Sequence, residues 1–292
     1  MRKALASPAV RQRAKDLGVD LADIKVASGD RIRHADLDAF LKYQGSATAS
    51  APTRAPMASG DDGIEEIKVV GLRRRIAENM AEAKRRIPHF AYVEELDVTA
   101  VEALRQAMNA ERGERPKLTM LPFLMRAMVK AAAAFPMVNA RYDDEANVVS
   151  RYGAVHLGMA TQTDAGLSVP VIRDAQTRDV WALAAEIVRL ADATRRGKAT
   201  REELSGSTIT LTSLGALGGI VSTPVINRPE VAIVGVNRMV ERPVVIEGRI
   251  EVRKMMNLSS SFDHRVVDGM DAAKFIQAVR RLIEVPALLF AD

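Results

Sequence analysis

The chain has 292 residues, of which 48% are hydrophobic, so it can bury a sizeable core and is long enough for two domains. It contains no cysteine, which excludes disulfides, thiolate metal sites and a catalytic cysteine. The net charge of +5 comes from 42 basic and 37 acidic residues that are interleaved, and only 4% of residues are aromatic. These two features argue against a nucleic-acid surface.

The sequence shows neither a membrane span nor a secretory signal. Its longest apolar stretch, residues 120–135, is interrupted by Arg126 and Lys130. It therefore lacks the roughly 18 uninterrupted apolar residues that a span requires. Basic residues near the start are not followed by an apolar core and a cleavage site. We predict no membrane partner and a cytoplasmic location.

The first predicted unit, residues 4–41, is small and helical. A helix over residues 8–17 ends at a turn at Gly18, and a loop through Gly29 leads to a second helix over about residues 34–41. The next stretch, residues 42–63, is rich in Ala, Ser, Thr, Pro and Gly and has no apolar periodicity. This composition predicts a flexible linker.

The third part, residues 64–292, mixes helical and strand patterns and predicts an α+β domain. Thr99 with Glu102, and Thr200 with Glu203, match the capping box, and the first pair would open a helix. Apolar periodicity predicts helices over residues 72–86, 99–111, 121–135 and 179–195, and one after residue 270. Alternating or β-branched runs predict strands near residues 90–98, 139–142, 148–151, 154–163, 167–172, 231–236 and 256–262, and a hairpin of residues 244–246 and 250–252.

Two strand ends carry candidate catalytic side chains. A β-branched strand breaks into a glycine-rich loop after Thr212 and Ser213, where a hydroxyl can donate to a developing oxyanion. Near the C-terminus, His264 lies on a loop that follows a strand, and an Asp268-Gly269 turn precedes the last helix.

Histidine has an ordinary pKa of about 6.5, so His264 is a candidate general base at neutral pH. Gly269 permits a tight turn that could fold the Asp268 carboxylate back towards the ring or the loop backbone. A structural histidine and turn-capping hydroxyls stay open as alternatives on these patterns alone. His89 and His156 are interpreted as structural, and no metal-ligand spacing occurs in the sequence.

The stretch around Thr212 and Ser213 and the stretch around His264 and Asp268 together resemble the catalytic domain of the dihydrolipoamide acyltransferases. These enzymes are the cores of the 2-oxo acid dehydrogenase complexes and share a fold with chloramphenicol acetyltransferase. The resemblance covers about residues 64–292 and includes Gly-Leu-Arg-Arg-Arg-Ile-Ala-Glu-Asn-Met at 71–80, Ile-Pro-His-Phe at 87–90 and Gly-Leu-Ser-Val-Pro-Val-Ile at 166–172. Residues 4–41 resemble the peripheral subunit-binding domain of the same family, through Ala-Ser-Pro-Ala-Val-Arg, Leu-Gly-Val-Asp-Leu-Ala-Asp-Ile and Asp-Arg-Ile-Arg-His-Ala-Asp-Leu.

The resemblance implies acyl transfer between dihydrolipoamide and coenzyme A. His264 would remove the thiol proton, Thr212 would stabilise the oxyanion and Asp268 would hold the loop and ring geometry. Many relatives have serine at the position of Thr212, so Ser213 could share its role. Positions matching the family's coenzyme A contacts and channel, besides Ser213, are Arg105, Thr119, Gln162, Leu167, Val169, Pro170 and Gly269.

The resemblance also implies partners. In this family the site lies between subunits of a trimer, and trimers assemble into larger cores, here expected to be a 24-mer. Arg11 and Arg31 match the positions that hold the 2-oxo acid decarboxylase or the dihydrolipoyl dehydrogenase, although Gln12 and the shorter loop before Arg31 depart from the family pattern. No lipoyl domain precedes residue 4, so we expect the lipoyl group on a truncated part of the chain or on another chain.

The transferred group and the activity leave alternatives. Residues 87–99 look most like the branched-chain members, with acetyltransferases second and succinyltransferases third. A noncatalytic core or tethering protein of the same fold is the alternative from another class. That alternative predicts loss of the histidine or the aspartate of the turn, and both are present as His264 and Asp268.

Overall fold

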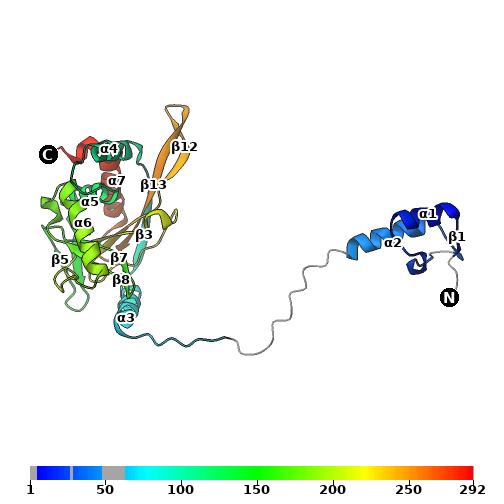
Figure 1. Cartoon of the computed structure of the whole chain (residues 1–292). Coiled ribbons are helices and arrows are strands. Elements are labelled where there is room, and N and C mark those ends of the chain that lie inside the picture. The colour runs from blue at the N-terminus through cyan, green and yellow to red at the C-terminus, as the bar shows by residue number, and fades with distance from the viewer. Residues whose placement is uncertain (1–4, 27–28, 48–62, 292) are drawn as a thin grey trace. The chain divides into compact units, whose positions relative to one another are not determined.

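The computed structural model describes residues 5–26, 29–47 and 63–291 (Figure 1). The chain divides into two compact units, residues 1–67 and 68–292, and each is described by itself. None of the helices within the described residues is long and apolar enough to cross a membrane.

The first unit is built from two helices, α1 (Pro8–Asp16) and α2 (His34–Ala47), a 3₁₀ turn (Leu21–Asp23) and two short parallel strands, β1 (Leu5–Ala6) and β2 (Arg31–Ile32). Ser7 caps α1 by accepting a hydrogen bond from the backbone N–H of Val10 at 3.3 Å. The small core of the first unit consists of Val10, Ala14, Ile24, Ile32 and Leu37.

The second helix of this unit is longer than the sequence predicts. It continues to Ala47, beyond the helix end expected at residue 41, while the linker over residues 42–63 stays a prediction. Adding a residue to an existing helix needs only a helix-compatible side chain and no apolar periodicity, so composition misplaces this boundary. The remainder of the predicted linker, residues 48–62, lies outside the described residues.

The second unit is organised around a seven-stranded mixed sheet in the order β12-β13-β11-β10-β6-β9, with β3 paired to β13. The strands are β3 (His89–Asp97), β6 (Leu157–Met159), β9 (Val171–Ile172), β10 (Ile209–Ser213), β11 (Ala232–Val236), β12 (Val240–Ile246) and β13 (Arg249–Asp263). Strand β10 is parallel to β6 and β11, whereas β13 runs antiparallel to β11, β12 and β3. The predicted α+β class is confirmed.

Helices α4 (Thr99–Ala110), α5 (Leu121–Ala134), α6 (Val180–Arg195) and α7 (Gly269–Glu284) gather beside the sheet (Figure 1). Helix α5 contacts both α6 and α7, and most of its residues are buried, because it is apolar on nearly every face. The core includes Phe123, Phe262 and Phe275, all fully buried. Helix α3 (Gly71–Arg86) buries only Ala83, and two hairpins, β4 (Ala140–Asp143) with β5 (Val148–Arg151) and β7 (Thr161–Thr163) with β8 (Gly166–Ser168), complete the unit.

Most predicted elements are present, with three local corrections. The expected strand at 154–163 is divided into β6 and β7. The expected strand at 167–172 is divided into β8 and β9, because Pro170 between them has no N–H to donate to a ladder. Thr99 and Glu102 do not form a capping box. Instead the Thr99 hydroxyl accepts the backbone N–H of Lys254 at 2.9 Å, while Glu102 is buried against Arg105 one turn along the same helix, and these two pairings replace the local motif.

Candidate active site

His264 begins the turn at the end of β13. Its backbone N–H donates to Pro88 O at 3.2 Å, and its ring leans on Phe90, with the ring centroids 4.4 Å apart. Phe90 is paired with Phe262 across β3 and β13, so the surface under the imidazole is part of the rigid sheet. The His264 side chain is exposed, and neither ring nitrogen bonds to another described residue. The imidazole is therefore held in place on one side and is accessible to a substrate.

The residues on either side of His264 form an ion pair that the sequence analysis did not predict. Asp263 is 1% exposed, and Arg265 donates to its carboxylate through Nε at 2.9 Å and Nη2 at 2.6 Å. Asp263 O also accepts the backbone N–H groups of Val266 and Val267 at 3.0 and 2.9 Å. The turn is thus anchored by Asp263. The sequence could have indicated this ion pair, because residues of opposite charge flank the candidate base.

Asp268 makes no hydrogen bond or ion pair with His264 within the described chain, so its expected role in holding the loop and ring stays a prediction. It occupies the N-cap position of α7, where its backbone carbonyl accepts the N–H of Ala272 at 3.0 Å and its side chain makes no capping hydrogen bond. Gly269 is the first residue of α7 and is not in the left-handed region, so the chain runs straight into the helix. Within one chain, the ion pair of Asp263 and Arg265 anchors the His264 turn.

The two hydroxyls at the end of β10 differ in their surroundings. Ser213 Oγ accepts the N–H of Gly215 at 3.1 Å and therefore caps the following turn. Thr212 is half-buried, and its hydroxyl has no hydrogen-bond partner among the described residues. Alternation along the strand puts Thr212 on the same face as Thr210 and puts Ser213 on the opposite face. Thr212 is thus the hydroxyl with no hydrogen bond to another described residue, and it lies on the opposite face from Ser213.

One chain does not bring Thr212 and His264 together. Thr212 pairs with Gly235 in β11, and Gly235 pairs with Ser259 in β13. His264 lies five residues beyond Ser259, which at about 3.3 Å per residue is roughly 16 Å further along the sheet. Two strand spacings of about 4.8 Å separate them sideways as well. The two groups can act on one acyl carbon only if they come from different chains.

The candidate coenzyme A residues lie in several separate places in the second unit. Arg105 donates to Glu102 at 2.7 Å through both Nε and Nη2, and also to Leu118 O at 3.0 Å. The bonds to Glu102 lower the pKa of its carboxyl. The bond to Leu118 O fixes the backbone next to Thr119, which is exposed. Gln162 and Leu167 face each other across the β7–β8 hairpin. Among the remaining candidates, Val169 is half-buried, Pro170 is buried and Gly269 is exposed.

The other two histidines in this unit bond to the backbone. His89 Nδ1 lies 2.9 Å from Ile87 O, and its Nε2 accepts the N–H of Ile226 at 3.0 Å. His156 Nδ1 accepts the N–H of Asp174 at 3.2 Å. Burial lowers the pKa of both rings. These contacts agree with structural roles, and no group of three metal-ligating side chains occurs within residues 5–26, 29–47 and 63–291.

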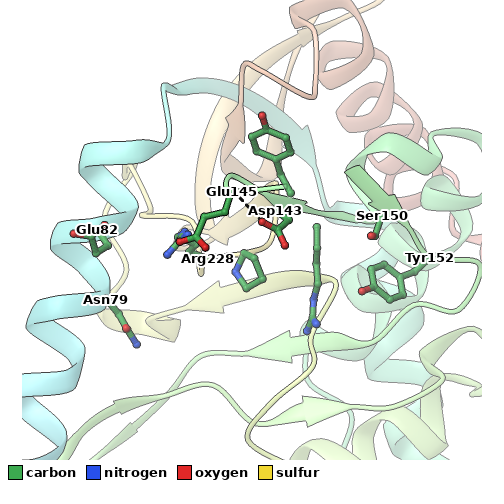
Figure 2. A pocket seen from close by; sticks show the side chains of 10 residues that line it. Asn79, Glu82, Asp143, Glu145, Ser150, Tyr152 and Arg228 are labelled. Atoms are coloured by element: carbon green, nitrogen blue, oxygen red, sulfur yellow. Dashed lines mark hydrogen bonds between the residues drawn. The ribbon is translucent and has the colours of Figure 1, made fainter. Parts of the chain in front are cut away.

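An open pocket of about 540 Å³ lies between α3 and the β4–β5 hairpin (Figure 2). Its lining is polar and includes Glu82, Arg141, Tyr142, Asp143 and Arg228. It contains neither His264 nor Thr212, so it is separate from the candidate catalytic residues.

Comparison with known proteins decides the family. A family model described as 2-oxoacid dehydrogenases acyltransferase (catalytic domain) matches residues 61–291, and one described as the E3 binding domain matches residues 4–38. The chain belongs to the 2-oxoacid dehydrogenase acyltransferases.

The sequence relatives agree with this assignment. The lipoamide acyltransferase component of the branched-chain alpha-keto acid dehydrogenase complex of Pseudomonas aeruginosa is 64% identical over 292 residues, covering 99% of this chain and 68% of the relative. The dihydrolipoyllysine-residue acetyltransferase component of the pyruvate dehydrogenase complex of Bacillus subtilis is 34% identical, covering 100% of this chain and 69% of the relative.

Two solved structures extend the comparison to the fold. The cubic core of a pyruvate dehydrogenase multienzyme complex has a TM-score of 0.75 and 34% identity, covering 82% of this chain and 99% of that one. The dihydrolipoamide acetyltransferase of Azotobacter vinelandii has a TM-score of 0.74 and 35% identity, covering 78% of this chain and 94% of that one. Work on the latter concerned the catalytic roles of a serine, a histidine and an asparagine. The histidine follows the serine by 52 residues and precedes the asparagine by 4, and the same separations relate Thr212, His264 and Asp268 here.

Proposed function

We propose that the chain transfers a branched-chain acyl group between dihydrolipoamide and coenzyme A, with His264 as the general base. The observation that carries this proposal is the placement of His264, an exposed imidazole fixed on a rigid sheet by Phe90 and the Asp263 anchor, in a family acyltransferase domain. The 64% identical relative, named for the branched-chain complex, supports the substrate class. An acetyl group is the second candidate, because acetyltransferases of pyruvate complexes are 34 to 36% identical.

The chemistry follows from the ordinary acidities of the groups. A thiol with a pKa of about 8.5 is mostly protonated at neutrality, so His264 accepts its proton as the sulfur attacks the acyl carbon. A new C–S bond forms, and the carbonyl oxygen becomes an oxyanion to which the Thr212 hydroxyl donates. Collapse breaks the old C–S bond, and the imidazolium returns the proton to the departing sulfur. The same steps in reverse regenerate the starting thioester.

Thr212 is proposed for the oxyanion role in preference to Ser213. Its hydroxyl has no partner among the described residues, while that of Ser213 is engaged by Gly215. The matching separation to the catalytic serine of the Azotobacter protein supports the same choice. Because Thr212 and His264 are far apart in one chain, we propose that each site combines them from two neighbouring subunits of a trimer, and the likeness to a cubic core supports assembly of trimers into a 24-subunit particle.

The first unit is proposed as the tether for the other enzymes of the complex. The match to an E3 binding domain supports dihydrolipoyl dehydrogenase as a partner, and the exposed Arg11 and Arg31 are the candidate contacts. The decarboxylase is proposed as a second partner of the same unit. Coenzyme A is a substrate, and we propose that the acyl group arrives on a lipoyl group attached to another domain. Cytoplasmic location stays a prediction.

The test compares variants of the full assembly with isobutyryl-, acetyl- and succinyl-coenzyme A and free dihydrolipoamide. His264→Ala should assemble normally and lose at least about a hundredfold in kcat. Near-normal turnover by that variant would remove the central claim, and a preference for acetyl-coenzyme A would correct the substrate.

A matched set separates the two hydroxyls. Thr212→Ser should keep most activity because the donor remains, whereas Thr212→Val keeps the branched shape and should lose about a hundredfold or more in kcat with KM little changed. Ser213→Ala should stay active. The opposite pattern, an active Thr212→Val and a crippled Ser213→Ala, would move the assignment by one residue.

A further inference from the structure

Arg265 ties the His264 turn to a distant part of the domain. Its guanidinium holds both oxygens of Asp263, forms an ion pair with Asp144 in the turn between β4 and β5, and lies 4.5 Å from the centre of the Tyr142 ring. The Arg265 side chain is only 29% exposed. A guanidinium held by two carboxylates and an aromatic face has little freedom to rotate.

Asp144 is not required for the turn in which it lies. The neighbouring Asp143 makes that turn, because its Oδ1 accepts the N–H groups of Glu145 and Ala146 at 2.9 and 3.0 Å. The bond from Glu145 is drawn in Figure 2. The Asp144 side chain is 10% exposed and lies between Arg265 and Arg228, with Arg228 at 3.2 Å.

Asp144 is charged in this position. Burial raises the pKa of its carboxyl, but the hydrogen bonds and charges of Arg265 and Arg228 outweigh burial and hold the pKa below its ordinary value. A largely buried, ionised aspartate that its own turn does not use has Arg265 and Arg228 as its partners, and Arg265 adjoins the candidate base.

We propose that Arg265 and Asp144 are positioning residues that keep the His264 imidazole in its reactive orientation. The backbone N–H of His264 is bonded to Pro88 O, and the next residue, Arg265, is held by its side chain. The turn therefore cannot move the imidazole away from Phe90. A misplacement of about 1 Å in a catalytic group can cost about a hundredfold in rate, so the fixation has a kinetic consequence. The proposal rests on the proposed function and assigns these two residues no contact with substrate.

The test measures kcat and KM for Asp144→Asn and Arg265→Gln in the assembled protein. Each variant should lower kcat by about ten- to a hundredfold and leave both KM values within about twofold, because only the orientation of the base changes. The two changes break one connection, so the double variant should be little worse than the more damaging single variant. Arg265→Lys, which keeps the charge but not the fork of donors, should recover part of the loss seen with Arg265→Gln.

Arg189→Gln is the matched control. Arg189 also joins two carboxylates, Glu186 and Glu203, each at 2.7 Å, but lies on α6 away from the turn. This variant should keep wild-type kcat. If the Arg265 variants lost activity only because an arginine that joins two carboxylates is needed for the fold, Arg189→Gln would lose activity as well.

Each outcome bears on one claim. If His264→Ala is inactive while Asp144→Asn and Arg265→Gln keep kcat within about twofold, the positioning proposal fails and the proposed function stands. If His264→Ala remains active, the proposed function itself fails. If Arg265→Gln does not assemble, the isosteric Asp144→Asn decides. If neither assembles, or if KM rises as kcat falls, the pair holds the fold and not the base, and the proposal is overturned.

Discussion

Glu230 offers a test of the energetics in the core of the domain. It is 1% exposed, and its carboxylate accepts hydrogen bonds from Ser207, from Thr210 at 2.7 Å and from Asn227 at 2.7 Å. Burial raises the pKa of Glu230 to about 7, and these hydrogen bonds together with the charge of Arg141 limit the rise. The group therefore titrates in the native protein near neutral pH.

The sign of the pH dependence follows from linkage. In the unfolded chain the carboxyl has its ordinary pKa of 4.5, and in the native protein its pKa is about 7. Between these values the native state binds more protons than the unfolded state, so the free energy of unfolding falls as pH rises and levels off above about pH 7. At about 1.4 kcal/mol per pKa unit, the total loss is about 3 kcal/mol.

Glu230→Gln removes this titration while keeping the shape of the side chain. The amide oxygen can accept from Ser207 and Asn227, and the Thr210 hydroxyl can turn to accept from the amide nitrogen. The variant should therefore lack the loss of stability that wild type shows between pH 5 and 8. At about 2–4 °C per kcal/mol, its Tm relative to wild type should rise by about 6–12 °C across that range.

Scanning calorimetry of the assembled protein at pH 5, 6, 7 and 8 measures the difference. Glu186→Gln is the control of opposite sign, because the hydrogen bond from Arg189 lowers the pKa of Glu186. Its contribution to stability is present above its ordinary pKa and is lost as pH falls, so this variant should not gain on wild type at high pH. A Tm difference between Glu230→Gln and wild type that is the same at pH 5 and pH 8 would refute the reasoning.

Two further changes probe the tether and the surface under the base. Changing both Arg11 and Arg31 to Glu should abolish co-sedimentation with dihydrolipoyl dehydrogenase while free dihydrolipoamide is still acylated, and unchanged co-sedimentation would exclude these arginines as the contacts. Phe90→Leu should lower kcat by about tenfold without loss of assembly, because it removes the ring on which His264 leans. Unchanged kcat would show that this contact does not orient the imidazole.

The elements of the fold were largely predictable because their patterns are local. Helix α5 carries a long apolar run and strand β10 a β-branched one, and both patterns are set by residues that are neighbours in the sequence. One error occurs where a distant contact competes with a local motif. The Thr99 hydroxyl accepts the backbone N–H of Lys254, 155 residues away, and not one from its own helix, and no local rule weighs such a contact against a cap.

The candidate catalytic residues were predictable, but their supports were not. His264 and Thr212 stand out because each is a reactive side chain at a strand end. The connection from Arg265 to Asp144 spans 121 residues, and nothing in either segment indicates the other. Asp268 was assigned a role because it lies four residues after His264. The buried Asp263, whose carboxylate anchors the turn, resembled an ordinary residue at the end of a strand.

The arrangement within one chain also accounts for the need for a second one. Thr212 presents a half-buried hydroxyl that bonds to no other described residue. His264 likewise presents a ring whose nitrogens bond to no other described residue. The sheet register holds these two groups far apart, and no rotation of side chains can close a separation of roughly 16 Å along the strands. Under the proposed function, each chain therefore carries half of two sites, and we propose that a complete site forms where the β10 end of one subunit meets the β13 turn of the next.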